Sequence, residues 1–355
     1  MDTSRPIAAW LISIVAMIAA MVVLGGLTRL THSGLSMVEW KPLTGWLPPL
    51  GDREWEEAFA AYRQFPEYKA FNEGMTLSGF KSIFWLEYIH RLWGRLIGVA
   101  FFVPFVVFMV KGWVRGALAV KLLVMFVLGG LQGVLGWYMV KSGLVDRPDV
   151  SQYRLVAHLG LALLIMGYML WVAMDLLDPR PRRGGGALAA AAAGVFALVF
   201  VTVLSGGFVA GLDTGFSYNT FPLMEGDPWP DGLFALDPVF VNFFENVATV
   251  QFTHRVLALA VLAAVAAFWA GAQRARLERR RRLAANVMAA AAAIQVGLGV
   301  STLVFMVPVP LAAAHQAGAM ILFCASLWVV HELRRGERAH HPIPAEHRKE
   351  ARPEP

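Results

Sequence analysis

Eight long apolar stretches dominate this sequence and decide what it can fold into. A membrane-spanning helix needs about 20 consecutive, mostly apolar residues, and eight stretches meet that requirement. They cover residues 7–27, 87–110, 118–140, 155–174, 187–210, 249–271, 284–306 and 312–331. The first is too long for the apolar part of a signal peptide, so it counts as a span. We therefore predict an all-α integral membrane protein with eight transmembrane helices.

Composition excludes several classes of protein. Of the 355 residues, 57% are hydrophobic and 16% are charged, whereas an average soluble domain is roughly one quarter charged. A soluble enzyme and a disordered chain are thereby excluded. The single cysteine, Cys324, excludes a disulfide framework, an iron-sulfur cluster on four thiolates and a thiolate zinc site. Any metal must be held by histidine, methionine or oxygen ligands.

The basic residues predict the orientation in the membrane. They gather in both terminal segments and in every second connection, and none lies between Arg183 and Arg255. By the positive-inside rule, both termini are cytoplasmic. The run from Arg279 to Arg282 is then a topology anchor, so we expect contact with membrane lipid and none with nucleic acid. No amphipathic Arg/Ser-rich transit peptide precedes the first span, which favours a bacterial cytoplasmic (inner) membrane.

Two long connections, 28–86 and 211–248, lie on the outer side in this topology and are rich in aromatic residues. In one of them Trp55, Phe59 and Tyr62 recur at helical spacing, which predicts an amphipathic helix lying on the membrane surface. We expect both connections to cover the outer face. Simple anchoring by an aromatic belt is the alternative.

The two halves of the chain resemble each other. Four landmarks recur in the same order at similar spacing, which indicates a duplicated unit of four helices. The pairs are Gly25-Gly26 with Gly206-Gly207, His90-Arg91 with His254-Arg255, Gln132 with Gln295, and His158 with His315. We expect two tandem pseudo-symmetric four-helix bundles, residues 1–175 and 187–333, followed by a cytoplasmic tail, 334–355. An even number of spans gives both halves the same orientation.

Four histidines stand near the outer ends of the even-numbered spans: His90, His158, His254 and His315. A lone membrane histidine is usually a packing residue, but four at matching repeat positions are costly to bury without a purpose. Two imidazoles facing each other across a bundle form an axial pair for a haem iron. We expect His90 with His158 to form one couple and His254 with His315 the other. Zinc would require further ligands.

Other residue types near these histidines fit a porphyrin. Glycines on the neighbouring spans make room for a flat macrocycle, although they also serve plain helix packing. Three arginines close to the first histidine of each couple are candidate contacts for haem propionates, with snorkelling to lipid headgroups as the alternative. They are Arg91, Arg95 and Arg255.

One asymmetry separates the halves. Glu87 stands three residues before His90, on the same helix face, whereas Gln251 stands at the matching place before His254. A carboxylate can move protons and an amide cannot, so the first half is the candidate for chemistry and the second for a permanently bound haem. Glu87 acting only as a hydrogen-bond acceptor that orients an imidazole is the alternative.

These motifs resemble those of the haem A synthase (Cox15/CtaA) family, in particular its mitochondrial and proteobacterial branch. The resemblance rests on the runs 25–31, 33–36 and 39–42, on Phe65-Pro66-Glu67-Tyr68, on Phe80-Lys81 and on 87–91. It implies a membrane oxidoreductase that oxidises a methyl group of haem O to a formyl group, yielding haem A for terminal oxidases.

The resemblance also assigns roles to residues. His254 and His315 would be axial ligands of a haem b cofactor, His90 and His158 would bracket the iron of the substrate haem O, and Glu87 would be the acidic residue needed for turnover. Haem O synthase (protohaem farnesyltransferase) is an expected partner by resemblance, and a second copy of the chain is another candidate. From the residues alone, a diheme b-type cytochrome that only passes electrons and a haem transporter or chaperone stay open.

Overall fold

The computed structural model describes residues 3–39, 45–143, 149–181 and 186–335. Within these ranges the regular structure is helical, and eight helices are long and apolar enough to cross a membrane. They are α1 (Ser4–Leu30), α4 (Leu77–Val110), α5 (Gly116–Gly143), α6 (Gln152–Leu177), α7 (Ala187–Gly211), α9 (Val247–Arg274), α10 (Arg279–Val304) and α11 (Val309–Leu333). The prediction of an all-α, eight-span membrane protein is confirmed. The tail residues 336–355, and with them His340, His341 and His347, lie outside the described residues.

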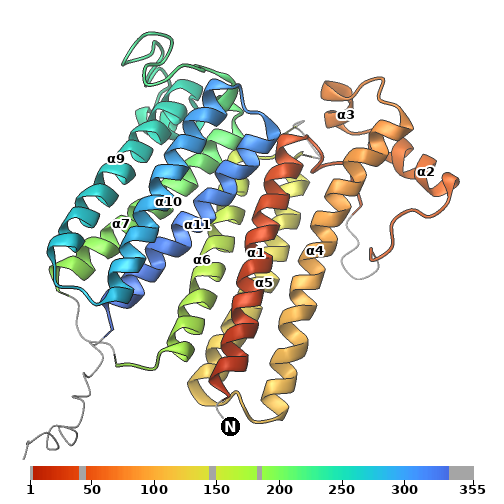
Figure 1. Cartoon of the computed structure of the whole chain (residues 1–355). Coiled ribbons are helices and arrows are strands. Elements are labelled where there is room, and N and C mark those ends of the chain that lie inside the picture. The colour runs from red at the N-terminus through yellow and green to blue at the C-terminus, as the bar shows by residue number, and fades with distance from the viewer. Residues whose placement is uncertain (1–2, 40–44, 144–148, 182–185, 336–355) are drawn as a thin grey trace, which may run out of the picture.

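Short helices occupy the two long connections. α2 (Asp52–Tyr62) and α3 (Pro66–Phe71) lie in the first, and η1 (Thr214–Phe216), η2 (Val239–Val241) and α8 (Asn242–Glu245) lie in the second. Both connections sit at the same end of the bundle (Figure 1). We call this end the cap end.

The helices form because lipid leaves no other way to satisfy backbone groups across an apolar run. Side chains mark where two of them begin: Thr76 accepts a hydrogen bond from the Gly79 amide at the start of α4, and Asn246 accepts one from Thr249 at the start of α9. Helix α4 has 34 residues, roughly 50 Å at the usual rise. Its first ten residues are therefore surplus to a bilayer core of about 30 Å and extend into the cap end.

The spans pack as two rings of four. In one ring α1 contacts α4 and α6, and α5 contacts α4 and α6; in the other α7 contacts α9 and α11, and α10 contacts α9 and α11. The rings meet where α6 packs on α7 and α11, and where α1 packs on α11 (Figure 1). Exchanging α1 with α7 and α6 with α11 reproduces this set of contacts, as expected for a duplicated unit.

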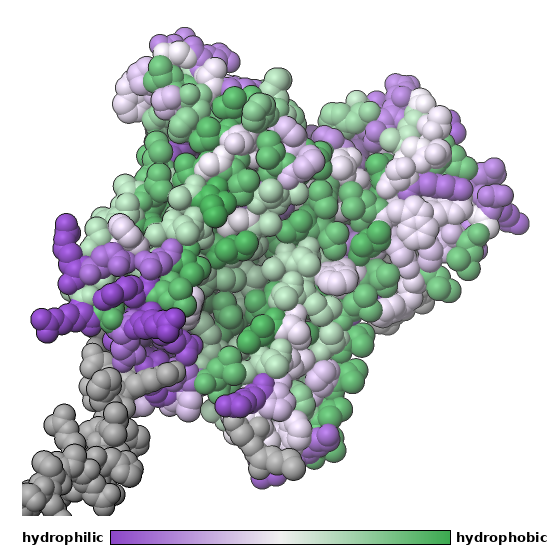
Figure 2. All heavy atoms as spheres, in the orientation of Figure 1, coloured by the Kyte–Doolittle hydropathy of each residue, from purple (hydrophilic) through white to green (hydrophobic). Residues whose placement is uncertain are grey.

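Figure 2 shows an apolar band across the spans, with hydrophilic side chains gathered toward the two ends. α4 and α5 are the least enclosed spans, since only 6% and 11% of their apolar windows are buried against protein, compared with 50% for α6. Large side chains on them face outward, including Val103, Val120 and Val127. The first ring therefore depends on lipid to cover this side.

The helix predicted around Trp55 exists, but its apolar face does not lie on the membrane. Trp55 and Tyr62 of α2 are buried in an aromatic cluster with Phe80 and Phe84 of α4. The protruding start of α4 offers a protein surface for these rings, which local periodicity cannot reveal. α2 and α3 thus form a compact unit on α4, which we call the outer cap.

Candidate functional site

The four sequence-predicted histidines lie toward the cap end, two in each ring. His90 on α4 and His158 on α6 belong to the first ring, and His254 on α9 and His315 on α11 belong to the second. Each couple expected from the repeat thus stands on two helices of one ring, α4 with α6 and α9 with α11.

Each imidazole rests on a glycine of a neighbouring helix. A β-carbon added to Gly25 would lie 2.9 Å from Cε1 of His90, and one added to Gly136 would lie 3.1 Å from Cε1 of His158. In the second ring the corresponding distances are 3.1 Å from Gly206 to His254 and 2.7 Å from Gly299 to His315. Any larger residue at these positions would push the ring aside.

Polar side chains contact three of the four imidazoles. The hydroxyl of Ser205 lies 2.8 Å from Nδ1 of His254, and the amide of Gln295 lies 3.1 Å from Nδ1 of His315 and donates to its carbonyl at 2.9 Å. Gln132 repeats the carbonyl contact with His158 at 2.9 Å, and its amide lies 3.4 Å from Nε2 of that imidazole. The Ser205 hydroxyl donates to the Thr202 carbonyl and can therefore accept from Nδ1–H of His254, which leaves Nε2 of that histidine for a metal.

The donor set fits haem and does not fit a free metal ion. In the described part of the chain no group of three or more His, Cys, Asp or Glu side chains is placed to hold a metal. Two imidazoles per ring of helices, each in contact with a glycine, suit the iron of a haem, whose porphyrin supplies the other ligands. Zinc would need three or four protein ligands.

Glu87 lies one helical turn before His90 and is 3% exposed. Its Oε2 accepts hydrogen bonds from the Ser36 hydroxyl and the Met37 amide, both at 2.7 Å, and its Oε1 pairs with Nη2 of Arg91 at 2.5 Å. Two hydrogen-bond donors and a cation therefore hold both carboxyl oxygens in place. Ser36 was not predicted as a site residue, although it belongs to a serine-containing motif that recurs in the second half as Ser217.

Gln251 occupies the matching place in the second ring and faces acceptors instead. Its Nε2 donates to the carbonyls of Thr214 and Ser217 at 2.7 and 2.5 Å, and its Oε1 accepts from Arg255 at 3.1 Å. The long connection thus presents hydrogen-bond donors to Glu87 in the first half and acceptors to Gln251 in the second. The asymmetry in sequence extends to the surroundings of both side chains.

The arginines after the first histidines tie the long connections to the spans. Arg91 donates to the carbonyls of Met37 and Glu39, and Arg255 donates to those of Tyr218 and Thr220. These carbonyls are at equivalent positions in the two halves. Nε of Arg255 is buried and has no hydrogen-bond partner among the residues that the structure describes.

The third predicted arginine, Arg95, lies with its guanidinium 5.8 Å from the centre of the Trp46 ring. It is therefore near the segment that leads into the outer cap. Such a cation–π arrangement holds the charge beside an apolar surface.

A polar contact next to His315 joins the two rings of helices. Gln316, next to His315, donates to the Val22 carbonyl of α1 at 2.9 Å and presses against Gly26. The residue before Gly26 is Gly25, the seat of His90. In the other direction Gly207 packs on Val156 and Leu159, which flank His158. The two couples are thus joined through the glycine pairs.

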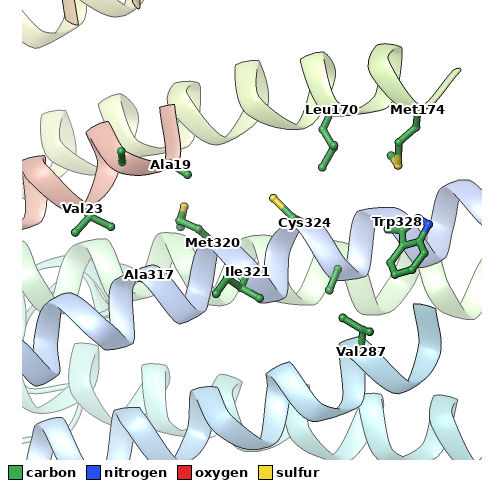
Figure 3. Close-up of a pocket in the computed structure, with 12 residues that line it drawn as sticks. Ala19, Val23, Leu170, Met174, Val287, Ala317, Met320, Ile321, Cys324 and Trp328 are labelled. Carbon is green, nitrogen blue, oxygen red and sulfur yellow. The ribbon is translucent and has the colours of Figure 1, made fainter. Parts of the chain in front are cut away.

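An apolar cavity of about 640 Å³ lies between α1, α6, α10 and α11, lined by residues that include Val23, Leu170, Met320 and Cys324 (Figure 3). None of the four histidines lines it. Cys324 is only partly covered and forms no disulfide. The cavity is therefore separate from the haem-type site.

Comparison with known proteins shows the family. The profile of the COX15-CtaA family, described as cytochrome oxidase assembly protein, matches residues 8–327. The chain belongs to this family. Among its curated relatives is a haem A synthase of Nitrosospira multiformis, 54% identical over 335 residues, covering 93% of this chain and 94% of the relative.

Two further relatives of this family member show how widely the likeness extends. A haem A synthase of Parvibaculum lavamentivorans is 52% identical, covering 93% of this chain and 94% of the relative. The haem A synthase COX15 of Bos taurus is 47% identical, covering 93% of this chain and 83% of the relative. The similarity includes bacterial and mitochondrial-type members alike.

Proposed function

We propose that this family member is a haem A synthase, an integral membrane oxidoreductase that converts a methyl group of haem O to a formyl group. The names of its relatives support the activity. The different roles proposed for the two rings rest on one observation. The carboxyl group of Glu87 is buried beside His90, whereas the amide of Gln251 occupies the matching place in the other ring. The first ring then binds the substrate and the second a resident haem b.

The histidines divide accordingly. His254 and His315 would hold haem b, which would supply one-electron redox chemistry when bound. His90 and His158 bracket the iron of haem O. The glycine seats hold each imidazole in place, because a side chain at any of them would collide with the ring.

Glu87 is the residue assigned to proton movement at the substrate. Ser36, Met37 and Arg91 fix both of its oxygens, so the carboxylate keeps one orientation and its burial excludes water. Arg91, Arg95 and Arg255 are the proposed propionate contacts. For Arg255 the buried Nε is the donor that stays available.

The distribution of basic residues supports a location and orientation in the membrane, and the two rings of helices support a division into two halves. We place the protein in the bacterial cytoplasmic membrane with both termini in the cytoplasm, so that the cap end is periplasmic. Residues 1–175 form the substrate half and 187–333 the resident-haem half, with 334–355 as a cytoplasmic tail. Haem O synthase is a proposed partner, and so is a second copy of the chain.

Haem extraction tests this function. Acid-acetone extracts of the purified protein, separated by reversed-phase chromatography, should contain haem B together with haem O, hydroxylated intermediates or haem A, and a deletion strain should lack haem A. Two haem B per chain with normal haem A in the deletion strain would identify a diheme electron carrier instead. Haem O or haem B without any oxidised product would point to a transporter.

A further inference from the structure

An ion pair at the cap end joins the two halves of the chain. Nη2 of Arg29, in the last turn of α1, donates to Oδ2 of Asp213 at 2.6 Å. Asp213 follows the end of α7 by two residues. The side chain of Arg29 is 14% exposed and that of Asp213 is 43% exposed. The cation is therefore largely enclosed, whereas its carboxylate partner reaches solvent.

The position of Arg29 on α1 places it between the two histidine couples. At about 100° per residue, Arg29 lies roughly 40° around the helix from Gly25 and roughly 60° from Gly26. Gly25 lies against the ring of His90 in the first ring of helices, and Gly26 lies against Gln316 in the second. Arg29 is one helical turn beyond these glycines, toward the cap end. It therefore stands over the junction of the two rings, closer to the face that meets His90.

The ion pair has no counterpart at the repeat-related positions. The repeat of the glycine pairs equates Arg29 with Ala210 and Asp213 with His32. The backbones of His32 and Asp213 agree, because both residues have a positive φ, 48° and 54°. An alanine cannot form an ion pair, so the packing of the duplicated unit does not require these charges. Arg29 therefore points to a role that belongs to the first half.

The first ring also has more cations near its histidines than the second. The arginine after the first histidine occurs in both rings, but Arg29 and Arg95 correspond to Ala210 and Leu259. At these matched positions the first ring has three arginines and the second has one. A carboxylate is costly to bury unless a cation pairs with it. The surplus of arginines therefore suits a ligand with carboxylates in the first ring.

Arg29 has a hydrogen-bond donor left for a further carboxylate. Its Nε is buried and has no partner among the residues that the structure describes. Nε and Nη2 form one edge of a guanidinium group, and in the pair of Arg180 with Asp178 both donate, at 2.8 and 2.6 Å. In the pair of Arg29 with Asp213 only Nη2 donates. A second carboxylate at Nε would satisfy a buried donor that is unfavourable to leave unpaired.

We propose that Arg29 binds a propionate of haem O in the first ring, with Asp213 as its counter-ion when no substrate is bound. This inference names a binding residue of the proposed haem A synthase and rests on that function. Nε donates to the propionate, and the partly exposed Asp213 yields its share of the guanidinium to the ligand at small cost, as expected for a solvent-accessible pair. The contact is specific to substrate, because the second ring has Ala210 at the matching place.

Binding titrations with two forms of the ligand test this contact. The purified protein in nanodiscs, with its resident haem, is titrated with haem O and with haem O dimethyl ester, whose propionates are uncharged. The wild type should prefer the free acid. Arg29→Gln should bind the acid on the order of 10-fold more weakly and the ester as the wild type does. Arg29→Lys keeps the charge without the planar fork and should lie between the two.

Asp213→Asn separates ligand binding from a purely structural role. Arg29→Gln and Asp213→Asn both break the ion pair, so a pair that only joined the halves would be lost in both, and acid and ester would bind equally poorly. In the proposed role the two variants differ, because Asp213→Asn removes the carboxylate that competes for Arg29. It should bind the acid at least as tightly as the wild type. Asparagine tolerates the positive φ at this position.

A control variant and the resident haem complete the experiment. Arg53→Gln, at an exposed arginine of α2, should titrate like the wild type, and all variants should keep the resident-haem absorption. A wild type without preference for the acid, an Arg29→Gln protein that keeps this preference, or equal losses in Arg29→Gln and Asp213→Asn would overturn the proposal. Absence of haem A from the wild type would instead contradict the proposed function, and the preference for the acid would persist in that case.

Discussion

Glu87 and Gln251 occupy equivalent places before the first histidine of each couple, but their surroundings have opposite hydrogen-bonding character. Glu87 meets the donors of Ser36 and Met37, and Gln251 meets the carbonyls of Thr214 and Ser217. Exchange of the two side chains would set donor against donor in one ring and acceptor against acceptor in the other. Each half is therefore built for its own residue.

Glu87→Gln should stop product formation without unfolding the protein. The amide cannot carry a proton, so we expect haem A output to fall at least on the order of 100-fold, while the resident haem keeps its absorption. Haem extraction and visible spectra measure both quantities. Glu73→Gln, an exposed carboxylate in the same connection, is the control, and near wild-type haem A from Glu87→Gln would refute the assigned role.

The two histidine couples should respond differently to substitution. His254→Ala or His315→Ala should abolish the low-spin absorption of the resident haem, because either change removes an axial ligand. His90→Ala should leave that absorption largely intact. His32→Asn serves as a control, since asparagine tolerates the positive φ of 48° at that position. The reverse pattern would mean that the halves have exchanged roles.

The glycine seats give a finer test of the same geometry. Gly299→Ala would place a β-carbon 2.7 Å from Cε1 of His315. Overpacking of this kind typically destabilises the folded protein by about 1–3 kcal/mol. We expect weaker resident-haem binding and a shifted spectrum, measured by haem titration. Gly194→Ala on α7 meets open space and should change neither. Equal spectra from both variants would show that the seat is not needed.

Arg255 should stabilise the local structure of the second long connection. Arg255→Ala removes donors to three backbone carbonyls, those of Tyr218, Thr220 and Leu223, and each lost hydrogen bond to a charged group is worth about 1.5–3 kcal/mol. Hydrogen exchange in residues 218–223 should accelerate. Arg53→Ala, which removes only an exposed pair with Glu57, should have little effect on α2. Unchanged exchange in Arg255→Ala would contradict this role.

At the end opposite the cap, Asp178 should make stability depend on pH in the acid range. Arg180 donates to both of its oxygens and lowers the pKa of Asp178 from 3.8 to about 2. A lowered native pKa means that the contribution is complete above about pH 4 and is lost as the pH falls through about 2. Asp178→Asn should unfold at lower temperature than wild type at pH 7, and this gap should narrow below pH 4. A gap that stays constant to pH 2 would refute the ionic contribution.

The spans follow from local sequence, because lipid imposes a minimum apolar length on each helix. The histidine couples stay a prediction, which the repeat of the four helices supports. The start of α4 did not follow, since residues 77–86 pack against the outer cap rather than lipid and carry no hydropathy signal. The contact of Gln316 with Val22 joins residues 294 positions apart in the chain, and apolar periodicity does not record such a contact.

The exposed sides of α4 and α5 have a practical consequence for the substrate half. In the proposed function, acyl chains of the surrounding bilayer cover the exposed sides of α4 and α5, so lipid forms part of the surface around the proposed haem O site. A tetrapyrrole dissolved in the membrane can approach that surface sideways without passing through water. Solubilisation in detergent replaces this lipid, which makes nanodiscs or native membranes the appropriate material for measuring substrate affinity.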